Sequence, residues 1–369
     1  MEKDLRPFSH LDWLTGGGKA ELDLSYSSIS PDWSSLAGRK GDHRSVSSTE
    51  TGGDRELVDL LSRMYGVEEE RVLLTNGCSG GNTLAFLSTI CRGSTILVEK
   101  PIYTPLVELP RWLGSRILFI KRRPDDYKFD LRELERKLAS GVDLFIMQNH
   151  NNPSGRLLTE TELKALASIL SKYGTKVLVD EVYLDYTLNH DPDGRYGPQA
   201  PSMVQLYDRA MVTSSVTKVY GAGGLMTGWL IGPRRLISRA RRIKVYTMPM
   251  VSLYGNRTAR EILEGRERYM PGALSEVRDK LRLVSEWARG RDDVHWSEPD
   301  GCAVGFLRYD HNIPSVDFAK GLLRDKGVKV VPGAFFHMEG GIRLGVALDY
   351  ERLKTALERL DRFLDEHTC

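Results

Sequence analysis

Cysteine is scarce in this sequence of 369 residues. Its four cysteines, Cys78, Cys91, Cys302 and Cys369, show no CxxC spacing. Thiols scattered in this way exclude a zinc ribbon and a disulfide framework, and they fit a cytoplasmic protein whose thiols stay reduced. We expect these cysteines to be small core residues.

The sequence also lacks long apolar runs and a strong excess of charge. No uninterrupted apolar stretch approaches the length of a membrane helix. Residues 1–6 mix charges with no apolar segment behind them, so no secretory signal is indicated. The formal net charge of +2 gives no reason to expect nucleic acid, a membrane surface or a polyanionic partner. Small-molecule chemistry is the remaining expectation.

Several common cofactor motifs are missing as well. The HExxH and CxxC metal-binding spacings do not occur, and no complete dinucleotide glycine fingerprint follows an apolar run. The glycine-rich segment 16–20 lacks the Ser/Thr and the spacing of a phosphate P-loop, so it predicts a flexible bend. We therefore expect no metal ion.

Short apolar runs alternate with segments of helical periodicity from about residue 71 onward. The runs are continuously apolar, which is typical of strands buried on both faces of a mostly parallel sheet. We predict an α/β fold with a mostly parallel seven-stranded sheet covered by helices, one of which spans 159–173 behind a capping Thr159. The seven predicted strands lie at 71–74, 95–98, 116–120, 142–147, 176–179, 210–213 and 229–231.

The pattern changes after Pro249, and the length of the chain favours two domains. A long helix is predicted over 254–290, followed by strands near 303–308 and 342–346 and helices near 316–326 and 350–366. We interpret these elements as a smaller α+β domain. The predicted division is an N-terminal segment 1–45 that joins the small domain, a large domain 46–255, and a connecting helix with the small domain over 256–369.

Lys218 stands in the most informative segment, Thr213-Ser214-Ser215-Val216-Thr217-Lys218, which is followed by four glycines within a few residues. A lysine after an apolar strand and a cluster of hydroxyls lies on a tight turn beside a pocket that tolerates anions. Burial or a neighbouring cation lowers the pKa of such an amine enough for imine formation.

Two further segments accompany this lysine. Residues 148–155, Gln-Asn-His-Asn-Asn-Pro-Ser-Gly, follow one apolar run, and residues 176–183 form another run that ends in Asp180 and continues to Tyr183. In this order, the three segments resemble the signature of fold-type I pyridoxal 5'-phosphate (PLP) enzymes, specifically the class I/II aminotransferases that are similar to aspartate aminotransferase. The resemblance extends from about Leu22 to the end of the chain. It implies that PLP forms a Schiff base with Lys218, that an amino acid and a 2-oxo acid are the substrates, and that the protein is a homodimer.

The resemblance also implies roles for residues around the cofactor ring. Asp180 would pair with the pyridine nitrogen and keep it protonated, so that the ring withdraws electrons. Asn152 and Tyr183 would donate hydrogen bonds to the phenolic oxygen of the cofactor, and Tyr103 would stack on the ring.

Other residues are implied to hold the phosphate and the substrate. The loop that contains Gly77, Cys78 and Ser79, before a helix expected to begin near Asn82, would bind the phosphate through backbone amides and a hydroxyl, with Ser215 as a second hydroxyl. Arg343 would bind the substrate α-carboxylate through two parallel hydrogen bonds, with Asn152 beside it.

Two positions depart from the family pattern. Eight residues after the lysine, Met226 occupies the place of an arginine that binds the phosphate, and residues 46–53 offer hydroxyls and an acid but no tyrosine for the phosphate of a partner subunit. We therefore expect weaker retention of PLP, or compensation by Lys244 or by an arginine of the run 234–242.

Several alternatives stay open on the sequence alone. A PLP-dependent decarboxylase or a β-eliminating lyase would need the same Lys218, Asp180 and Asn152, and Met226 leaves room for a degenerate PLP-binding protein without catalysis. An α/β enzyme with another cofactor ranks last. A second arginine for a distal substrate carboxylate, such as Arg257 or Arg44, is not selected by any spacing.

Overall fold

A computed structural model describes Trp13 and residues 20–25, 27, 29, 52–191 and 193–367. Cys369, Arg44, the glycines of the predicted bend at 16–18 and the segment 46–51 lie outside these residues. The predictions for these residues therefore stay predictions.

The central feature is a seven-stranded sheet, and every strand predicted for it is present. The strands lie in the order β2-β10-β9-β6-β5-β3-β4. All neighbouring pairs are parallel except those of β10, which is antiparallel to both β2 and β9. The strands span β2 Val72–Asn76, β3 Thr95–Lys100, β4 Arg116–Lys121, β5 Leu144–Gln148, β6 Lys176–Asp180, β9 Ala210–Ser215 and β10 Thr227–Ile231. The predicted α/β class is confirmed.

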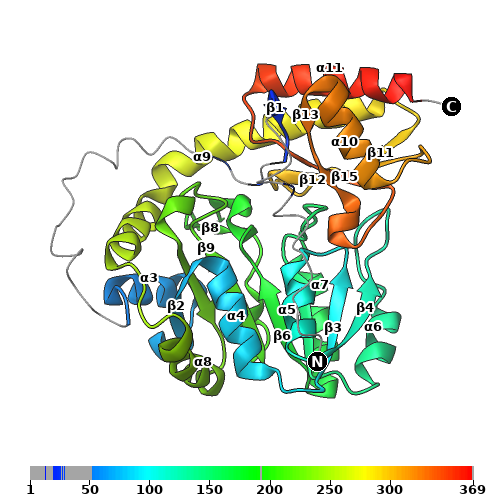
Figure 1. Ribbon diagram of the computed structural model, residues 1–369. Coiled ribbons are helices and arrows are strands. Elements are labelled where there is room, and N and C mark those ends of the chain that lie inside the picture. The colour runs from blue at the N-terminus through cyan, green and yellow to red at the C-terminus, as the bar shows by residue number, and fades with distance from the viewer. Residues whose placement is uncertain are drawn as a thin grey trace.

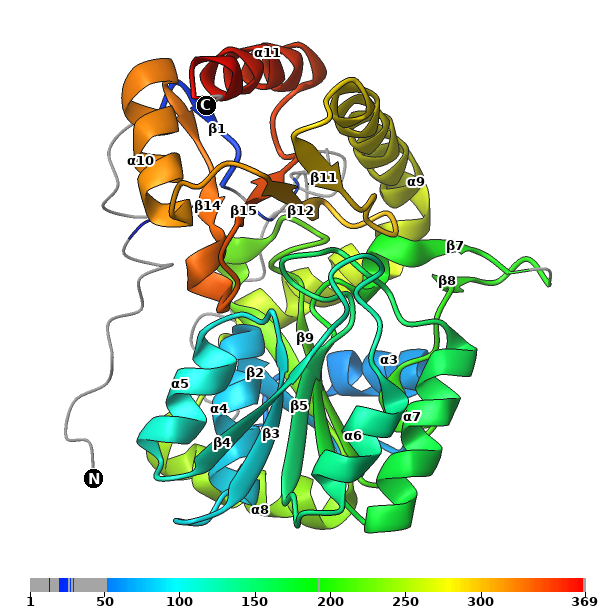
Figure 2. The ribbon, with the colours of Figure 1, turned by 90° about the vertical axis from the view of Figure 1, so that its right-hand side faces the viewer.

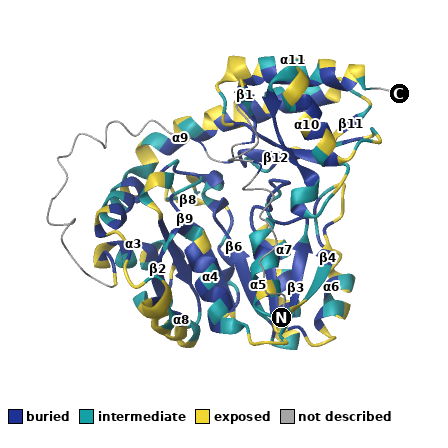
Figure 3. Ribbon diagram, in the orientation of Figure 1, coloured by how far each residue is buried: buried dark blue, intermediate teal, exposed yellow. Residues whose placement is uncertain are grey.

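Helices cover both faces of this sheet, because successive strand residues point to opposite sides. On β5, Leu144 and Ile146 pack on one side with the buried residues of α4, α5 and α8, whereas Phe145 and Met147 pack on the other side with those of α3, α6 and α7. Figure 2 shows the sheet between these layers, and Figure 3 shows its strands as mostly buried, except for the edge strand β4. The helices span α3 Arg55–Tyr65, α4 Gly77–Thr89, α5 Pro105–Trp112, α6 Leu131–Leu138, α7 Glu160–Tyr173 and α8 Arg234–Thr247.

Two of these helices test predicted boundaries. α7 begins as predicted, because the Thr159 hydroxyl accepts a hydrogen bond from the Glu162 amide and the Glu162 carboxylate accepts one from the Thr159 amide. α4 begins at Gly77, five residues earlier than the predicted start near Asn82, so that part of the prediction is wrong. Glycine is a poor helix former, but a side chain at Gly81 would come within 3.0 Å of Thr213 on the sheet. Close packing of the helix on the sheet explains the glycine at position 81.

A second sheet lies above the first in Figure 1, and α9 runs between the two parts. Its four antiparallel strands lie in the order β11-β12-β15-β14. The predicted long helix, both strands and both later helices of this part are present. The elements are α9 Leu253–Arg289, β11 Val294–Trp296, β12 Val304–Tyr309, α10 Ser315–Lys326, β14 Val331–Pro332, β15 Gly341–Gly345 and α11 Tyr350–Glu366.

The two remaining strand pairs are short. Strand β1, Leu22–Asp23, pairs in parallel with β13, Val328–Lys329, so the N-terminal segment contacts the second part of the fold. Strands β7, Leu188–His190, and β8, Tyr196–Pro198, form an antiparallel pair. The division at residues 45 and 255 stays a prediction. Within the described part of the chain, no helix is both long and apolar enough to cross a bilayer.

Candidate active site

A cavity of about 270 Å³ lies where strands of the large sheet end. Asn76, Gln148 and Asp180 are the last residues of β2, β5 and β6, and they lie on its wall, while Arg343 enters from β15 of the second sheet. Ligands of open α/β sheets bind at the carboxyl ends of the strands, so this cavity is the candidate site. Its wall consists of Ser27, Asn76, Gly77, Cys78, Ser79, Tyr103, Gln148, Asn152, Asp180, Val182, Tyr183, Thr217, Lys218, Met226 and Arg343.

Lys218 follows β9 and is partly buried. Its Nζ atom donates a hydrogen bond of 3.2 Å to the Ser27 hydroxyl. Burial lowers the pKa of the Lys218 amine, and the positive charge of Arg343 lowers it further, while Asp180 acts in the opposite direction. The amine is therefore easier to deprotonate than an exposed lysine, as the sequence predicts.

Asp180 is buried at the end of β6, with a donor on each carboxylate oxygen. The Val182 amide donates to Oδ1 over 3.2 Å, and the Asn82 carboxamide donates to Oδ2 over 3.0 Å. Burial raises the pKa of the Asp180 carboxyl, and the Asn82 and Val182 hydrogen bonds oppose that rise. The carboxylate therefore requires these donors, or a cation, to remain ionised.

The first turn of α4 forms another part of the wall. Gly77, at a φ of 67°, begins the helix, and its first backbone amides have no partner within the helix. Gly228 of β10 permits this approach, because a Cβ atom there would lie 2.4 Å from the Gly77 carbonyl carbon and 2.7 Å from the Cys78 nitrogen. The amides of a helix N-terminus, together with the Ser79 hydroxyl, form a suitable site for an anion.

Arg343 is almost completely buried, with 1% of its surface exposed. Its Nη1 atom donates to Asn152 Oδ1 over 3.2 Å, and its Nη2 atom donates to the Ser25 carbonyl over 2.6 Å. The guanidinium also lies 5.3 Å from the centre of the Phe336 ring. Its Nε atom has no hydrogen-bond partner among the described residues. A buried guanidinium with a free donor is suited to bind a carboxylate.

Tyr103 and Asn152 lie on two loops that share a buried ion pair, Glu99 with Arg122. The Arg122 Nε atom lies 2.6 Å from one Glu99 oxygen. The other Glu99 oxygen accepts hydrogen bonds from the Gln148 amide and from the Asn151 side chain. The Gln148 side chain in turn accepts a hydrogen bond of 3.1 Å from the Tyr103 amide. The ion pair thus fixes both loops relative to each other.

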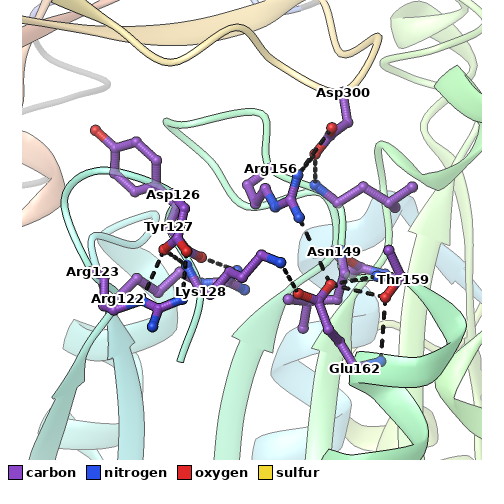
Figure 4. Close-up of polar contacts among 12 residues, drawn as sticks. Arg122, Arg123, Asp126, Tyr127, Lys128, Asn149, Arg156, Thr159, Glu162 and Asp300 are labelled. Carbon is purple, nitrogen blue, oxygen red and sulfur yellow. Dashed lines mark hydrogen bonds and ion pairs between the residues drawn. The ribbon is translucent and has the colours of Figure 1, made fainter. Parts of the chain in front are cut away.

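The Asn152 loop is also fixed from outside (Figure 4). Arg156 lies 3.0 Å from Asp300, a residue of the second part of the fold, and Asp300 also accepts a hydrogen bond from the Leu157 amide. Arg156 also lies 3.8 Å from Glu162 of α7, which in turn lies 2.9 Å from the Lys128 amine. These contacts connect the loop to both parts of the structure.

The predicted site residues therefore converge, with one exception. Ser215 is buried and does not lie on the cavity wall; its hydroxyl is 2.7 Å from the hydroxyl of Thr217, which does line the cavity. Lys244 and Arg241, proposed to compensate for Met226, line a different cavity beside Gly53 and Val72. Met226 itself lies on the wall and is 58% exposed. The individual roles of the predicted residues stay predictions.

Sequence reasoning missed four polar residues here. Ser27 accepts a hydrogen bond from Lys218, Asn76 and Gln148 line the cavity, and Asn82 donates a hydrogen bond to Asp180 from behind the wall. Gln148 is the first residue of the segment 148–155 that the sequence analysis identified. Its position at the end of an apolar run, which became β5, could have indicated that it lines the site. For Ser27 and Asn82 no such signal exists, because their partners are far away along the chain. The described residues contain no group of three or more side chains suited to hold a metal ion.

Comparison with known proteins agrees with this geometry. The family model for aminotransferase class I and II matches residues 27–360. The aspartate aminotransferase of Thermococcus kodakarensis is 27% identical over 365 residues, which cover 96% of this chain and 91% of the relative. The probable N-acetyl-LL-diaminopimelate aminotransferase of Bacillus subtilis is 27% identical over 326 residues, which cover 84% and 79%. A solved structure of a PLP-dependent aminotransferase from Streptococcus suis has a TM-score of 0.86 at 25% identity, with 100% of both chains covered.

Proposed function

The chain belongs to the class I and II aminotransferase family and is a PLP-dependent transaminase, and from that premise we propose that Lys218 is its catalytic residue. One observation carries the proposal. The amine of Lys218 lines the same cavity as the buried carboxylate of Asp180 and the buried guanidinium of Arg343. Transfer of an amino group requires these three groups: a base, an acid that activates the cofactor, and a cation that orients the substrate.

The residues present fit PLP. The first turn of α4 offers backbone amides and the exposed Ser79 hydroxyl for the phosphate. Burial of Asp180 favours its neutral form, and a protonated ring nitrogen would supply the cation that keeps it ionised. Tyr103, Asn152 and Tyr183 lie on the same wall, where they would contact the ring and its oxygen.

When bound, PLP would act as an electron sink that acidifies the hydrogen on the substrate α-carbon. Lys218 would hold the cofactor in the resting enzyme and, once released, accept that proton at Nζ. The lowered pKa of Lys218 leaves a larger share of the amine neutral near pH 7, which a general base requires. Ser27 accepts a hydrogen bond from Nζ, so it would keep the amine in reach when the proton moves.

Arg343 would orient the substrate. Its Asn152 and Ser25 contacts fix the plane of the guanidinium, and its Nε atom has no partner among the described residues. A carboxylate bound there would hold the α-carbon at a fixed position relative to Lys218. We therefore propose an amino acid with a free α-carboxylate as donor and a 2-oxo acid as acceptor.

We also propose that the enzyme is a homodimer, because large apolar side chains lie exposed at Met226 on the cavity wall, at the end of α8 and at the start of α9. Met226, Tyr246, Met250 and Tyr254 are 58%, 91%, 50% and 47% exposed. Exposed apolar groups gathered at the end of α8 and the start of α9 are typical of a protein interface. Sedimentation velocity of wild type and of a Tyr246→Glu, Met250→Glu double variant tests this. A wild type that sediments as a monomer, in the same way as the variant, would contradict it.

The cytoplasm is the compartment we propose. Cys78, Cys91 and Cys302 carry free thiols, as is usual for proteins of a reducing compartment. Labelling of the free thiols in intact cells, before the protein is isolated, tests this proposal. Cysteines that are already oxidised at that point would contradict a reducing compartment.

Borohydride reduction followed by peptide mapping tests the catalytic assignment. Wild type reconstituted with PLP should carry the reduced label on the peptide that contains Lys218, and Lys354→Ala, on the surface of α11, should do the same. Lys218→Ala should lose the label and reduce 2-oxo acid formation from a panel of amino acids by about 10²- to 10⁴-fold, the range for a lost acid-base group. Parallel measurement of CO2 and ammonia separates transamination from decarboxylation and elimination. A label on another peptide would contradict the proposal.

A further inference from the structure

Asn82 lies behind the cavity wall and is not itself part of that wall. It is on α4, one turn after Cys78, and only 6% of its surface is exposed. Both ends of its carboxamide are engaged: Nδ2 donates to Asp180 Oδ2 over 3.0 Å, and Oδ1 accepts a hydrogen bond of 2.7 Å from the Thr213 hydroxyl. The three side chains come from α4, β6 and β9.

The partners determine the orientation of the Asn82 amide. With Oδ1 facing the Thr213 hydroxyl, the NH2 group faces the carboxylate, whereas the flipped amide would place its oxygen against an oxygen of Asp180. The hydrogen bonds therefore run in one sense, from Thr213 to Asn82 to Asp180. Each bond in such a chain polarises the next, so the carboxylate receives a stronger donor than an isolated amide.

We propose that Asn82 is a positioning residue that keeps the Asp180 carboxylate ionised and directed into the cavity, so that this carboxylate can hold a proton on the cofactor ring nitrogen. The proposal rests on the role of Asp180 in the proposed function. Thr213 takes part as the residue that fixes the amide of Asn82.

The chain offers a matched series of variants. Asn82→Leu keeps the approximate volume and removes the donor to Asp180. Thr213→Val keeps the shape and removes only the hydroxyl that orients the amide, while Thr213→Ser restores that hydroxyl. Thr83→Val, next to Asn82 on the exposed side of α4, removes a hydroxyl bonded to the Ser79 carbonyl and serves as the control.

The measurement compares binding of PLP with binding of 1-deaza-PLP, an analogue that has carbon in place of the ring nitrogen. Wild type should bind PLP more tightly than the analogue, and Asn82→Leu should reduce this preference about ten- to hundredfold, the range for a hydrogen bond to a charged group. Thr213→Val should reduce it less, while Thr213→Ser and Thr83→Val should match wild type. Turnover at saturating PLP provides a second readout. Its acid limb should move to higher pH in Asn82→Leu, because a carboxyl that loses a donor has a higher pKa.

The outcomes separate this proposal from the proposed function. A wild type that forms 2-oxo acid, together with an Asn82→Leu variant that retains both the cofactor preference and the acid limb, would overturn the positioning role alone. A wild type that forms no 2-oxo acid and shows no preference for PLP would overturn both. If Asn82→Leu does not fold, Thr213→Val decides the question. A Thr213→Val variant whose preference for PLP over 1-deaza-PLP equals that of wild type and of Thr213→Ser would overturn the proposal.

Discussion

The inner and outer ends of the cavity differ in burial and in polarity. At the inner end, Asp180, Asn152 and Arg343 are buried, and each is hydrogen-bonded to other residues of this chain. At the outer end, the first turn of α4 lies beside Met226, which is 58% exposed and offers no charge. The difference teaches that the side chains proposed for the chemistry are fixed by the fold of one chain, whereas the proposed phosphate site offers only the backbone amides and the Ser79 hydroxyl of one helix turn. Two substitutions test this contrast and a third extends it beyond the inner end, from the largest expected effect to the smallest.

Arg343→Lys tests the inner end. Lysine keeps the charge but cannot offer two parallel donors, so we expect kcat/KM for the amino donor to fall about ten- to hundredfold. Steady-state kinetics measure this fall, and Arg308→Lys on neighbouring β12 is the matched control. A primary amine without a carboxylate should be an equally poor amino donor for wild type and for Arg343→Lys. If the loss for that amine equals the loss for amino acids, Arg343 does not bind the carboxylate.

Met226→Arg tests the outer end. A guanidinium at the rim should form a charge-assisted hydrogen bond with the phosphate and tighten PLP binding by about tenfold or more. Equilibrium dialysis measures the dissociation constant, and Met226→Leu should leave it unchanged. Equal affinity of the arginine variant and wild type would show that the phosphate does not lie beside position 226.

Glu181→Gln extends the comparison beyond the inner end, because Glu181 follows Asp180 and is buried behind it. Its carboxyl accepts hydrogen bonds from the Ser202 hydroxyl and the Met203 amide, and burial raises its pKa from 4.5 to about 8. The folded state therefore holds this proton while the unfolded state releases it. The contribution of this proton to the free energy of unfolding is fully present below pH 4.5 and is lost as the pH rises to about 8.

Glutamine carries no titrating proton, so the stability of Glu181→Gln relative to wild type should rise between pH 4.5 and 8 and then level off. Thermal unfolding at a series of pH values measures the difference, with the exposed Glu160→Gln as control. A difference that is constant with pH would show that Glu181 does not titrate in this window.

Much of the fold was predictable because a strand that is buried on both faces has a continuous apolar run in the sequence. The seven continuous apolar runs each became a strand, and the Thr159 cap marked the start of α7. The antiparallel direction of β10 was not predicted, since an apolar run reads the same in either direction. Strands β1, β13 and β14 have two residues each and show no periodicity.

The site was predictable where a motif keeps its residues close along the chain. Nine predicted residues line the cavity, including Lys218, Asp180 and Arg343. Ser215 does not, since it is buried behind Thr217, whose hydroxyl lies 2.7 Å from its own. Asn82 escaped prediction because its partners Asp180 and Thr213 are 98 and 131 residues away, so only the fold brings them together.

The hydrogen at Gly228, in place of a side chain, sets how closely the first turn of α4 approaches strand β10. Because even a methyl group would overlap the backbone of Gly77, the sheet and the helix above it are in contact at their minimum separation. Any larger residue at position 228 must therefore move the first turn of α4 away from β10, together with the amides that we propose for the phosphate.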